Sequence, residues 1–369
     1  IDGPLMVVAG PGTGKTELLS MRAANILQKT DTLPENILCL TFTESGANAM
    51  RERLTSIIGA DAYKVAIHTF HSFGSEIINQ NRQFFYGGAE FRPADELSSY
   101  EILRDILDEL PFDNPLASKM NGEYTHLGDI LTTISELKKS GLTSDELLKI
   151  IDSNEQTLDT FEERIAEIFG ARVSKSTITT LQPLSLEIAE YTSSSVPPNI
   201  TPLANTLALS LAHSIDEAEE SGSTKPITAW KNKWCEKNEQ GKTVFKDRKR
   251  HEKLRAVSYV YFQYLNRMQE AALYDFDDMV LRVVHALEVF PELRYNLQEK
   301  YLYIMVDEFQ DTNLAQARIL TSLTALETGD APNIMVVGDD DQAIYSFQGA
   351  EVRNIMHFKQ QYEGAKLVV

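Results

Sequence analysis

The stretch Leu5–Thr16, LMVVAGPGTGKT, decides the fold. It begins with four apolar residues, continues as a glycine-rich loop, and leads into a helical pattern from about Lys15 to Gln28. Short, fully apolar strands that alternate with helices are typical of a parallel sheet covered on both faces. Glycines let a backbone fold closely around phosphate groups, and a helix N-terminus adds N–H donors and a favourable dipole. The stretch therefore predicts a phosphate-binding loop between a strand and a helix.

The predicted nucleotide contacts come from one continuous loop: Ala9, Gly10, Pro11, Gly12, Thr13, Gly14, Lys15 and Thr16. In such a loop the lysine reaches the β- and γ-phosphates, and the following hydroxyl ligates Mg²⁺. The strict pattern has glycine at the position of Ala9, so this loop departs from it there. An ordinary glycine-rich turn is the alternative, but Gly-Lys-Thr between a strand and a helix favours the phosphate site.

Two acidic segments each follow a short apolar run in the last quarter of the chain. The first, DEFQD, begins at Asp307, and the second, GDDDQ, ends at Gln342. Carboxylates at the C-terminal end of a parallel strand lie where ligands bind. We expect Asp307 to hold Mg²⁺ together with Thr16, and Glu308 to orient and deprotonate the attacking water. Gln342 could hydrogen-bond the γ-phosphate, although residue chemistry alone favours a polar loop there. With Lys15, these residues predict nucleotide hydrolysis.

Helical periodicity dominates the middle of the chain, where we find no convincing strand and no internal repeat. Strand–helix alternation occupies the two ends. This pattern predicts an α/β domain in two parts, residues 1–84 and 273–369, interrupted by an all-α insertion at 85–272.

Composition narrows the classes of protein. The 369 residues are 43% apolar and 24% charged, as in globular proteins, and no apolar run reaches the roughly 18 residues of a membrane span. We therefore expect no membrane partner. Two cysteines exclude a disulfide scaffold and fit a reducing, cytoplasmic location. A net charge of -19 means that any nucleic-acid contact must be local. Both ends of the sequence have the character of cuts through a longer protein.

Together the motifs resemble those of the UvrD/Rep/PcrA branch of superfamily 1 DNA helicases. The resemblance rests on GPGTGKT at 10–16, TFT at 41–43, TFHSF at 69–73, DFDD at 275–278, DEFQDT at 307–312 and GDDDQ-x-IY at 338–345. It is weak across the helical middle. It implies a P-loop NTPase domain of RecA-like fold, with residues 1–84 and 273–369 as motor domain 1A and 85–272 as an enlarged subdomain 1B.

The resemblance implies ATP as the substrate, with Mg²⁺, and 3′→5′ translocation along single-stranded DNA with unwinding at single-strand/duplex junctions. It also implies a second motor domain of the same chain, outside this sequence, whose arginines reach the γ-phosphate. Such an arginine contributes about 10³–10⁵ in rate, so we expect these residues alone to be nearly inactive.

The DNA contacts that the resemblance implies lie just past strands: Phe42, Thr43, Thr69, Phe70, His71, Tyr345 and Phe347. Aromatic rings there could stack on bases without reading sequence, and the polar groups could hydrogen-bond phosphates or sugars. Core packing is the alternative for each aromatic ring. By the family pattern, Phe42 and Phe347 are the expected base-stackers.

Three departures from the family pattern concern ligand contacts. Glu17 stands where an adenine-holding arginine is common, and Glu44-Ser45 replaces Asn-Lys beside the DNA. Phe347-Gln348 replaces Trp-Arg, which keeps a stacking ring and loses an arginine between the two sites.

One basic segment, residues 225–255, has 11 lysines and arginines against four acids, with Trp230, Trp234 and Phe245 among them. It is either a DNA contact or a solvated helix face that pairs with the acids at 216–220.

Other functions stay open at this stage. The chain could belong to a helicase–nuclease subunit whose nuclease lies beyond it, or to a DNA-binding scaffold with an uncoupled motor. A P-loop kinase or GTPase is disfavoured by the DEFQD segment and by the lack of a guanine-reading Asn-Lys-x-Asp. Residue chemistry does not separate DNA from RNA.

Overall fold

The structure is a computed structural model. It describes residues 2–10, 12–85, 91–192, 196–197, 200–326, 329, 331–339, 358, 361–362 and 364–368, with the backbone alone at 247 and 249. The chain forms two compact units. The first comprises Ile1–Ser99, Thr132–Leu142 and Arg267–Val369, and the second Tyr100–Leu131 and Thr143–Asn266. The predicted subdomain boundaries at 84/85 and 272/273 stay a prediction, and these units divide the chain at other residues.

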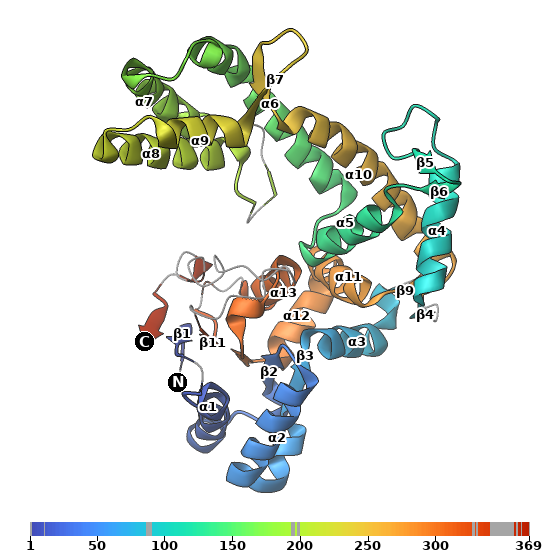
Figure 1. Cartoon of the computed structure of the whole chain (residues 1–369). Coiled ribbons are helices and arrows are strands. Elements are labelled where there is room, and N and C mark those ends of the chain that lie inside the picture. Colours follow the sequence, from blue (N-terminus) through green and yellow to red (C-terminus); the bar gives the residue numbers. More distant parts are fainter. Residues whose placement is uncertain are drawn as a thin grey trace. The chain divides into compact units, whose positions relative to one another are not determined.

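The first unit contains a parallel sheet with six strands among the described residues (Figure 1). Its strands are β1 Leu5–Val8, β2 Ile37–Thr41, β3 Ala66–Thr69, β10 Tyr303–Val306, β11 Ile334–Gly338 and β12 Lys366–Val368. They lie in the order β12-β1-β11-β10-β2-β3. In register, Leu5 pairs with Met335 and Tyr303 with Ile37.

Helices cover both faces of this sheet. Val7, Cys39 and Met305 belong to the core cluster on one face, which includes residues of α1 Lys15–Lys29 and α2 Glu44–Ile58. Met6 and Leu38, each one residue earlier in its strand, belong to the cluster on the other face. That cluster draws on α3 Phe70–Gln80, α11 Phe276–Val289, α12 Pro291–Lys300 and α13 Leu314–Thr324. Every residue of β2, β10 and β11 is buried, which explains why their sequences show apolar runs. The predicted P-loop NTPase fold class is confirmed.

The strand order brings together residues that are far apart in sequence. β1 and β2 follow one another in the chain, but they are not neighbours in the sheet. β11 and β10, which come some 300 residues later in the sequence, lie between them. All the strands are parallel, so the C-terminal ends of β1, β11 and β10 meet at one edge of the sheet. Ligands of open parallel sheets bind at such a reversal of strand order.

The remaining elements of the first unit are short. They include the 3₁₀ helices η1 Pro34–Asn36, η2 Gly59–Lys64, η3 Arg82–Phe84 and η5 Phe309–Asp311, and the paired strands β4 Arg92–Pro93 and β9 Leu273–Tyr274. Three helices, α4 Glu96–Asp108, α5 Leu127–Lys139 and α10 Asp247–Glu270, have residues in both units.

The second unit is mainly helical. Besides most of α10, it contains α6 Ser144–Gly170, α7 Lys175–Glu190, α8 Leu203–Ser221 and α9 Lys225–Trp234. Its described residues also contain two hairpins that we did not predict, β5 Lys119–Met120 with β6 Glu123–Tyr124, and β7 Cys235–Lys237 with β8 Thr243–Phe245. These strands are too short to show a period of two. In the second hairpin the Asn238 side chain accepts hydrogen bonds from the N–H groups of Gln240 and Lys242, which stabilises the turn.

None of the described helices has both the length and the apolar composition that crossing a bilayer requires.

Candidate functional site

The glycine-rich loop turns sharply between β1 and α1. Gly12 and Gly14 have φ angles of 74° and 87°, a left-handed conformation that favours glycine. The N–H of Ala9 donates to the carbonyl of Gly338 at 3.0 Å, which attaches the start of the loop to the end of β11. Within the loop, Thr13 Oγ1 donates to the Gly10 carbonyl at 2.8 Å. Pro11 lies outside the described residues. The other residues of the loop lie at the C-terminal edge of the sheet, between β1 and α1.

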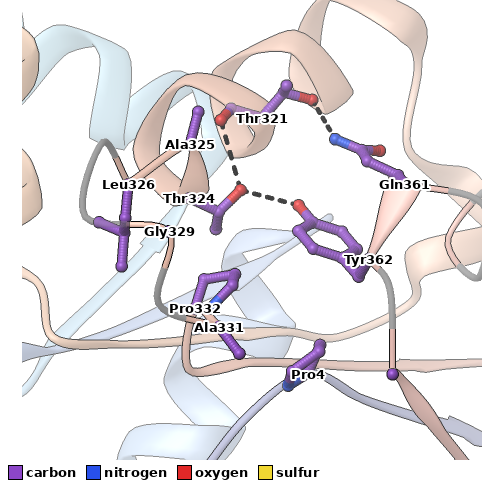
Figure 2. Close-up of a pocket in the computed structure, with 11 residues that line it drawn as sticks. Pro4, Thr321, Thr324, Ala325, Leu326, Gly329, Ala331, Pro332, Gln361 and Tyr362 are labelled. Carbon is purple, nitrogen blue, oxygen red and sulfur yellow. Dashed lines mark hydrogen bonds between the residues drawn. The ribbon is translucent and has the colours of Figure 1, made fainter.

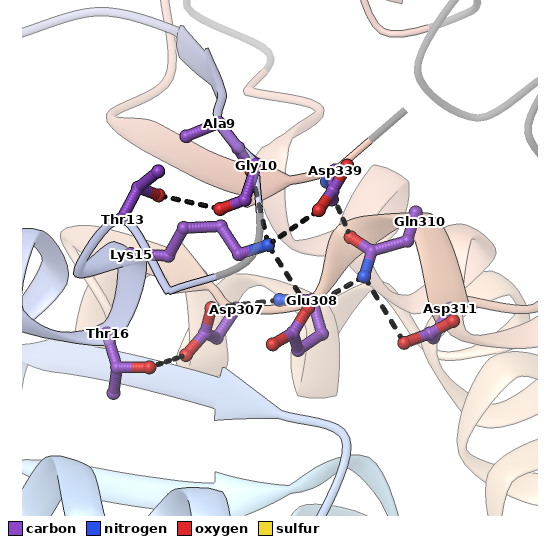
Figure 3. Close-up of polar contacts among 10 residues, drawn as sticks. All are labelled: Ala9, Gly10, Thr13, Lys15, Thr16, Asp307, Glu308, Gln310, Asp311 and Asp339. Carbon is purple, nitrogen blue, oxygen red and sulfur yellow. Dashed lines mark hydrogen bonds and ion pairs between the residues drawn. The ribbon is translucent and has the colours of Figure 1, made fainter. Parts of the chain in front are cut away.

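Lys15 points back across the mouth of the loop (Figure 3). Its side chain is mostly buried, and Nζ donates to the Ala9 carbonyl at 3.2 Å. The same Nζ lies 3.4 Å from Asp339 Oδ2 and 3.9 Å from Glu308 Oε2. One ammonium group therefore faces carboxylates from the ends of two different strands.

Thr16 and Asp307 meet beside the lysine. Thr16 Oγ1 donates to Asp307 Oδ2 at 2.8 Å, and the N–H of Glu308 donates to Asp307 Oδ1 at 3.0 Å. Burial raises the pKa of Asp307, and the hydrogen bond from Thr16 opposes that rise.

This oxygen pair is chemically suited to Mg²⁺, a hard cation that takes few protein ligands and completes its shell with water and phosphate. The described residues hold no cluster of three or more acidic, histidine or cysteine side chains for a metal ion.

Glu308 has an unusual backbone conformation. Its φ and ψ of 50° and 46° are left-handed, which for a residue other than glycine costs on the order of 1–3 kcal/mol. Its side chain is 38% exposed, so the carboxylate reaches solvent at the mouth of the site. The Asp311 N–H donates to the Glu308 carbonyl at 2.9 Å and helps to hold this turn. Strain of this kind persists where the surrounding structure enforces it, which is common at functional sites.

Sequence reasoning gave no role to Gln310, Asp311 or Asp339. The Gln310 side-chain amide connects Glu308, Asp311 and Asp339: Nε2 donates to Glu308 Oε2 at 2.6 Å and to Asp311 Oδ2 at 3.4 Å, while Oε1 accepts from the Asp339 N–H at 3.0 Å. Burial raises the pKa of Asp311 to about 6, and the negative charge of Glu308 adds to the rise. The available signal was that Gln310 and Asp311 belong to the acidic segment that supplies Asp307.

The predicted catalytic residues Lys15, Asp307 and Glu308 lie together at this edge. Gln342, Tyr345 and Phe347 lie outside the described residues, and their roles stay predictions.

Of the predicted DNA contacts, Phe42, Thr43 and His71 have accessible surface past the ends of β2 and β3. Phe42 is half-buried, while Thr43 is exposed and accepts the Gly46 N–H at 3.0 Å as the cap of α2. His71 is half-buried, 5.9 Å between ring centroids from the exposed Phe276. Burial lowers the pKa of His71, so the ring is neutral near pH 7.

Two other predicted contacts face inward. Phe70 is 3% exposed and belongs to the core cluster under α11, so core packing accounts for it, and we correct the expectation that it stacks on a base. Thr69 is buried as well: its hydroxyl caps α3 through the Ser72 N–H and donates to Glu44 Oε1 at 3.0 Å. Glu44, one of the departures from the family pattern, thus joins the loops that follow β2 and β3.

Several residues of the basic segment at 225–255 make structural contacts within the second unit. Trp230 and Phe245 are buried in its core cluster. Arg248 pairs with Asp159 and Glu162 of α6. Arg255 also pairs with α6, through Asp152 and Glu155. These observations favour the pairing interpretation, with acids of α6 as the arginine partners in place of the acids at 216–220.

The DFDD segment caps α11. The Asp275 carboxylate accepts a hydrogen bond from the Asp278 N–H at 2.8 Å, and the Asp278 carboxylate accepts one from the Asp275 N–H at 3.1 Å. Lys138, buried at the end of α5, lies 2.5 Å from Asp275 Oδ2 and 2.8 Å from Asp278 Oδ1. This segment therefore attaches residues 132–142 to the rest of the first unit.

A separate pocket of about 540 Å³ lies near Pro4, at the N-terminal end of β1 and away from the glycine-rich loop (Figure 2). Its polar groups bond to one another: the hydroxyls of Thr324 and Tyr362 are 2.9 Å apart, and Gln361 donates to Thr321. Burial raises the pKa of Tyr362 to about 12, so the phenol stays protonated. We assign this pocket no role.

Comparison with known proteins gives a family match along almost the whole chain. The model of the UvrD/REP helicase N-terminal domain matches residues 1–363. The chain is similar to a DNA helicase II of Rickettsia typhi, with 29% identity over all of this chain and 39% of that protein. It is also similar to ATP-dependent DNA helicases PcrA of Staphylococcus aureus and Staphylococcus epidermidis, with 24% and 25% identity over all of this chain and 35% of each. The chain thus spans 35–39% of the length of these curated relatives.

Proposed function

This chain belongs to the UvrD/REP helicase family, and on that premise we propose that it is the ATP-binding half of a DNA helicase. The proposed activity is hydrolysis of Mg-ATP coupled to 3′→5′ translocation on single-stranded DNA and unwinding at single-strand/duplex junctions. The names of its relatives, DNA helicase II and ATP-dependent DNA helicase PcrA, support the coarser part of this proposal, an ATP-dependent DNA helicase.

The observation that carries the proposal is the meeting of loop and acids at one edge of the sheet. Lys15 and Thr16 begin the helix after β1, and Asp307 and Glu308 follow β10, yet Thr16 Oγ1 and Asp307 Oδ2 are 2.8 Å apart. Adjacent N–H groups, a lysine, a hydroxyl and two carboxylates are the groups that phosphoryl transfer to water requires.

In the proposed reaction, Lys15 binds the β- and γ-phosphates, while Thr16 and Asp307 hold Mg²⁺. Mg²⁺ held there would supply positive charge to the phosphate oxygens. Glu308 accepts a proton as the water oxygen bonds to the γ-phosphorus. The bond to the β–γ bridging oxygen then breaks, and ADP and phosphate leave. Gln342 is proposed to hydrogen-bond the γ-phosphate.

The DNA is proposed to cross the other end of the same edge, over the loops that follow β2 and β3. Phe42 and His71 would contact bases or sugars there, and Thr43 a phosphate or sugar. Tyr345 and Phe347 complete the proposed contact set. Because β2 neighbours β10 in the sheet, DNA on these loops would lie one strand away from Asp307 and Glu308. That proximity supports coupling between the two sites.

A second motor domain is part of the proposal, because the relatives continue well beyond the region that this chain matches. It would supply arginines to the γ-phosphate, so the 369 residues alone should turn over slowly. A cytoplasmic location also remains part of the proposal.

The test is steady-state ATP hydrolysis with and without single-stranded DNA. It uses this chain and a version continued through the second motor domain, each also as Glu308→Gln. We expect DNA-stimulated turnover by the longer protein, its loss in Glu308→Gln, and little turnover by the shorter chain. Strand displacement from 3′- and 5′-tailed duplexes checks the polarity. ATP binding by the longer protein with no stimulation by DNA would overturn the motor and favour a DNA-binding scaffold.

A further inference from the structure

Gln310 connects the two acidic segments at the site. Its side chain is 1% exposed and lies between the end of β10 and the end of β11. Through Nε2 it reaches Glu308 at 2.6 Å, and through Oε1 it reaches the backbone of Asp339 at 3.0 Å (Figure 3). Asp339 in turn faces Lys15 at 3.4 Å. A continuous chain of contacts therefore runs from the loop lysine to the Glu308 carboxylate.

Only one orientation of the Gln310 amide satisfies its neighbours. Carboxylates accept hydrogen bonds and a backbone N–H donates, so the NH₂ group must face Glu308 and Asp311 and the oxygen must face the Asp339 N–H. A flipped amide would direct its oxygen at two carboxylates and its NH₂ group at a donor. The amide therefore holds the Glu308 carboxylate by a charge-assisted hydrogen bond in a defined direction.

The backbone on both sides is shaped around this side chain. A Cβ at Gly338 would lie 3.0 Å from Gln310 Oε1 and 3.4 Å from the Gln310 N atom, closer than ordinary contact. Glu308, two residues before Gln310, has the left-handed backbone described above. The absence of a side chain at Gly338 makes room for the amide, and the turn at Glu308 brings the carboxylate onto it.

We propose that Gln310 is a positioning residue for ATP hydrolysis, which holds the Glu308 carboxylate toward the attacking water and links it to Asp339 at the lysine. When a γ-phosphate binds Lys15, the Lys15–Asp339 contact changes. The Gln310 amide, which is hydrogen-bonded to both Asp339 and Glu308, transmits that change to the Glu308 carboxylate. This inference rests on the proposed function, because it assigns Gln310 a part in that same hydrolysis.

The test compares Gln310→Met with Gln316→Met in the protein continued through the second motor domain. Gln316 is also a buried glutamine in a hydrogen-bonded pair, and its hydrogen bonds among the described residues are with Asn313 at the start of α13 rather than with the site residues. We expect Gln310→Met to lower the kcat of DNA-stimulated ATP hydrolysis by about 10- to 100-fold, with the KM for ATP within about twofold of wild type. Gln316→Met should keep the kcat near wild type.

A double variant separates positioning from a general structural effect. If Gln310 acts through Glu308, adding Gln310→Met to Glu308→Gln should reduce the residual rate no further. Should Gln310→Met fail to fold, Gln310→Asn serves instead, because its amide is one carbon too short to bridge the two segments. A kcat equal to that of Gln316→Met, or additive losses in the double variant, would overturn the inference and leave the ATPase intact. A wild-type protein without DNA-stimulated hydrolysis would overturn the proposed function itself.

Discussion

Replacing Lys138 by methionine should destabilise the first unit strongly. The Lys138 side chain is 0% exposed, with Nζ at 2.5 Å from Asp275 Oδ2 and 2.8 Å from Asp278 Oδ1. Asp275 is partly solvated, but Asp278 is 1% exposed and would remain buried without its counter-ion. Removing one partner of a buried ion pair costs about 3–5 kcal/mol. We expect that loss here, because water does not reach the Asp278 carboxylate.

Urea unfolding followed by far-UV circular dichroism measures this loss. With a slope of about 3 kcal/mol per molar urea, the midpoint of the first unit should fall by about 1–1.7 M. Both tryptophans, Trp230 and Trp234, belong to the second unit, so their fluorescence gives a separate signal for that unit. The double variant Lys138→Met/Asp278→Asn should recover at least half of the loss, since the asparagine keeps an acceptor for the cap and has no charge.

The pH dependence of Lys138→Met gives a second check. Burial raises the pKa of Asp278, and Lys138 opposes that rise, so the variant should raise it further. A carboxyl with a higher pKa in the folded state binds more protons there than in the unfolded chain, so its contribution to stability falls as pH rises. The deficit of the variant should therefore shrink as pH falls from 7 toward 4. A loss below about 1 kcal/mol, or one independent of pH, would refute the argument.

Three further predictions concern single side chains. Because burial raises the pKa of Asp311 to about 6, its ionisation destabilises the fold increasingly between about pH 4 and pH 6. Asp311→Asn should thus be the more stable protein at pH 7, on the order of 1 kcal/mol after screening by solvent, and should lose that advantage below pH 4 in urea titrations. Gly338→Ala would push a methyl group against Gln310, and should lower the kcat for ATP several-fold with unchanged nucleotide affinity in an equilibrium binding assay. Arg248→Ala should lower the stability of the second unit by only about 0.5–1 kcal/mol, because its ion pairs with Asp159 and Glu162 are partly exposed. Unchanged affinity for single-stranded and duplex DNA in fluorescence anisotropy would support structural pairing of Arg248, whereas weakened binding would restore the DNA interpretation.

The sequence predicted those parts of the fold in which the local pattern of apolar residues matches their burial in the folded structure. The runs at Leu5–Val8 and Tyr303–Val306 are apolar throughout because helices cover both faces of the sheet, so short segments sufficed to identify them. The hairpins escaped prediction because strands of two or three residues, β5 to β8, carry no periodic signal. Asn238 and the residues after it form a recognisable turn only when the flanking strands are known.

The same contrast between local sequence pattern and tertiary environment explains which site residues could be predicted. Lys15 and Thr16 depend on one continuous strand–loop–helix stretch, and their positions followed from it. Phe70 begins a helix whose inward face is set by α11, some 200 residues later in the chain, so the TFHSF segment alone did not show which ring turns into the core. Gln310 is the harder case, since its place in the structure depends on the backbone N–H of Asp339, just after the neighbouring strand β11, and not on any side-chain pattern in the sequence. Of the three hydrogen-bond partners described for Gln310, Asp339 lies outside its own segment, and only the pairing of β10 with β11 brings Asp339 within reach.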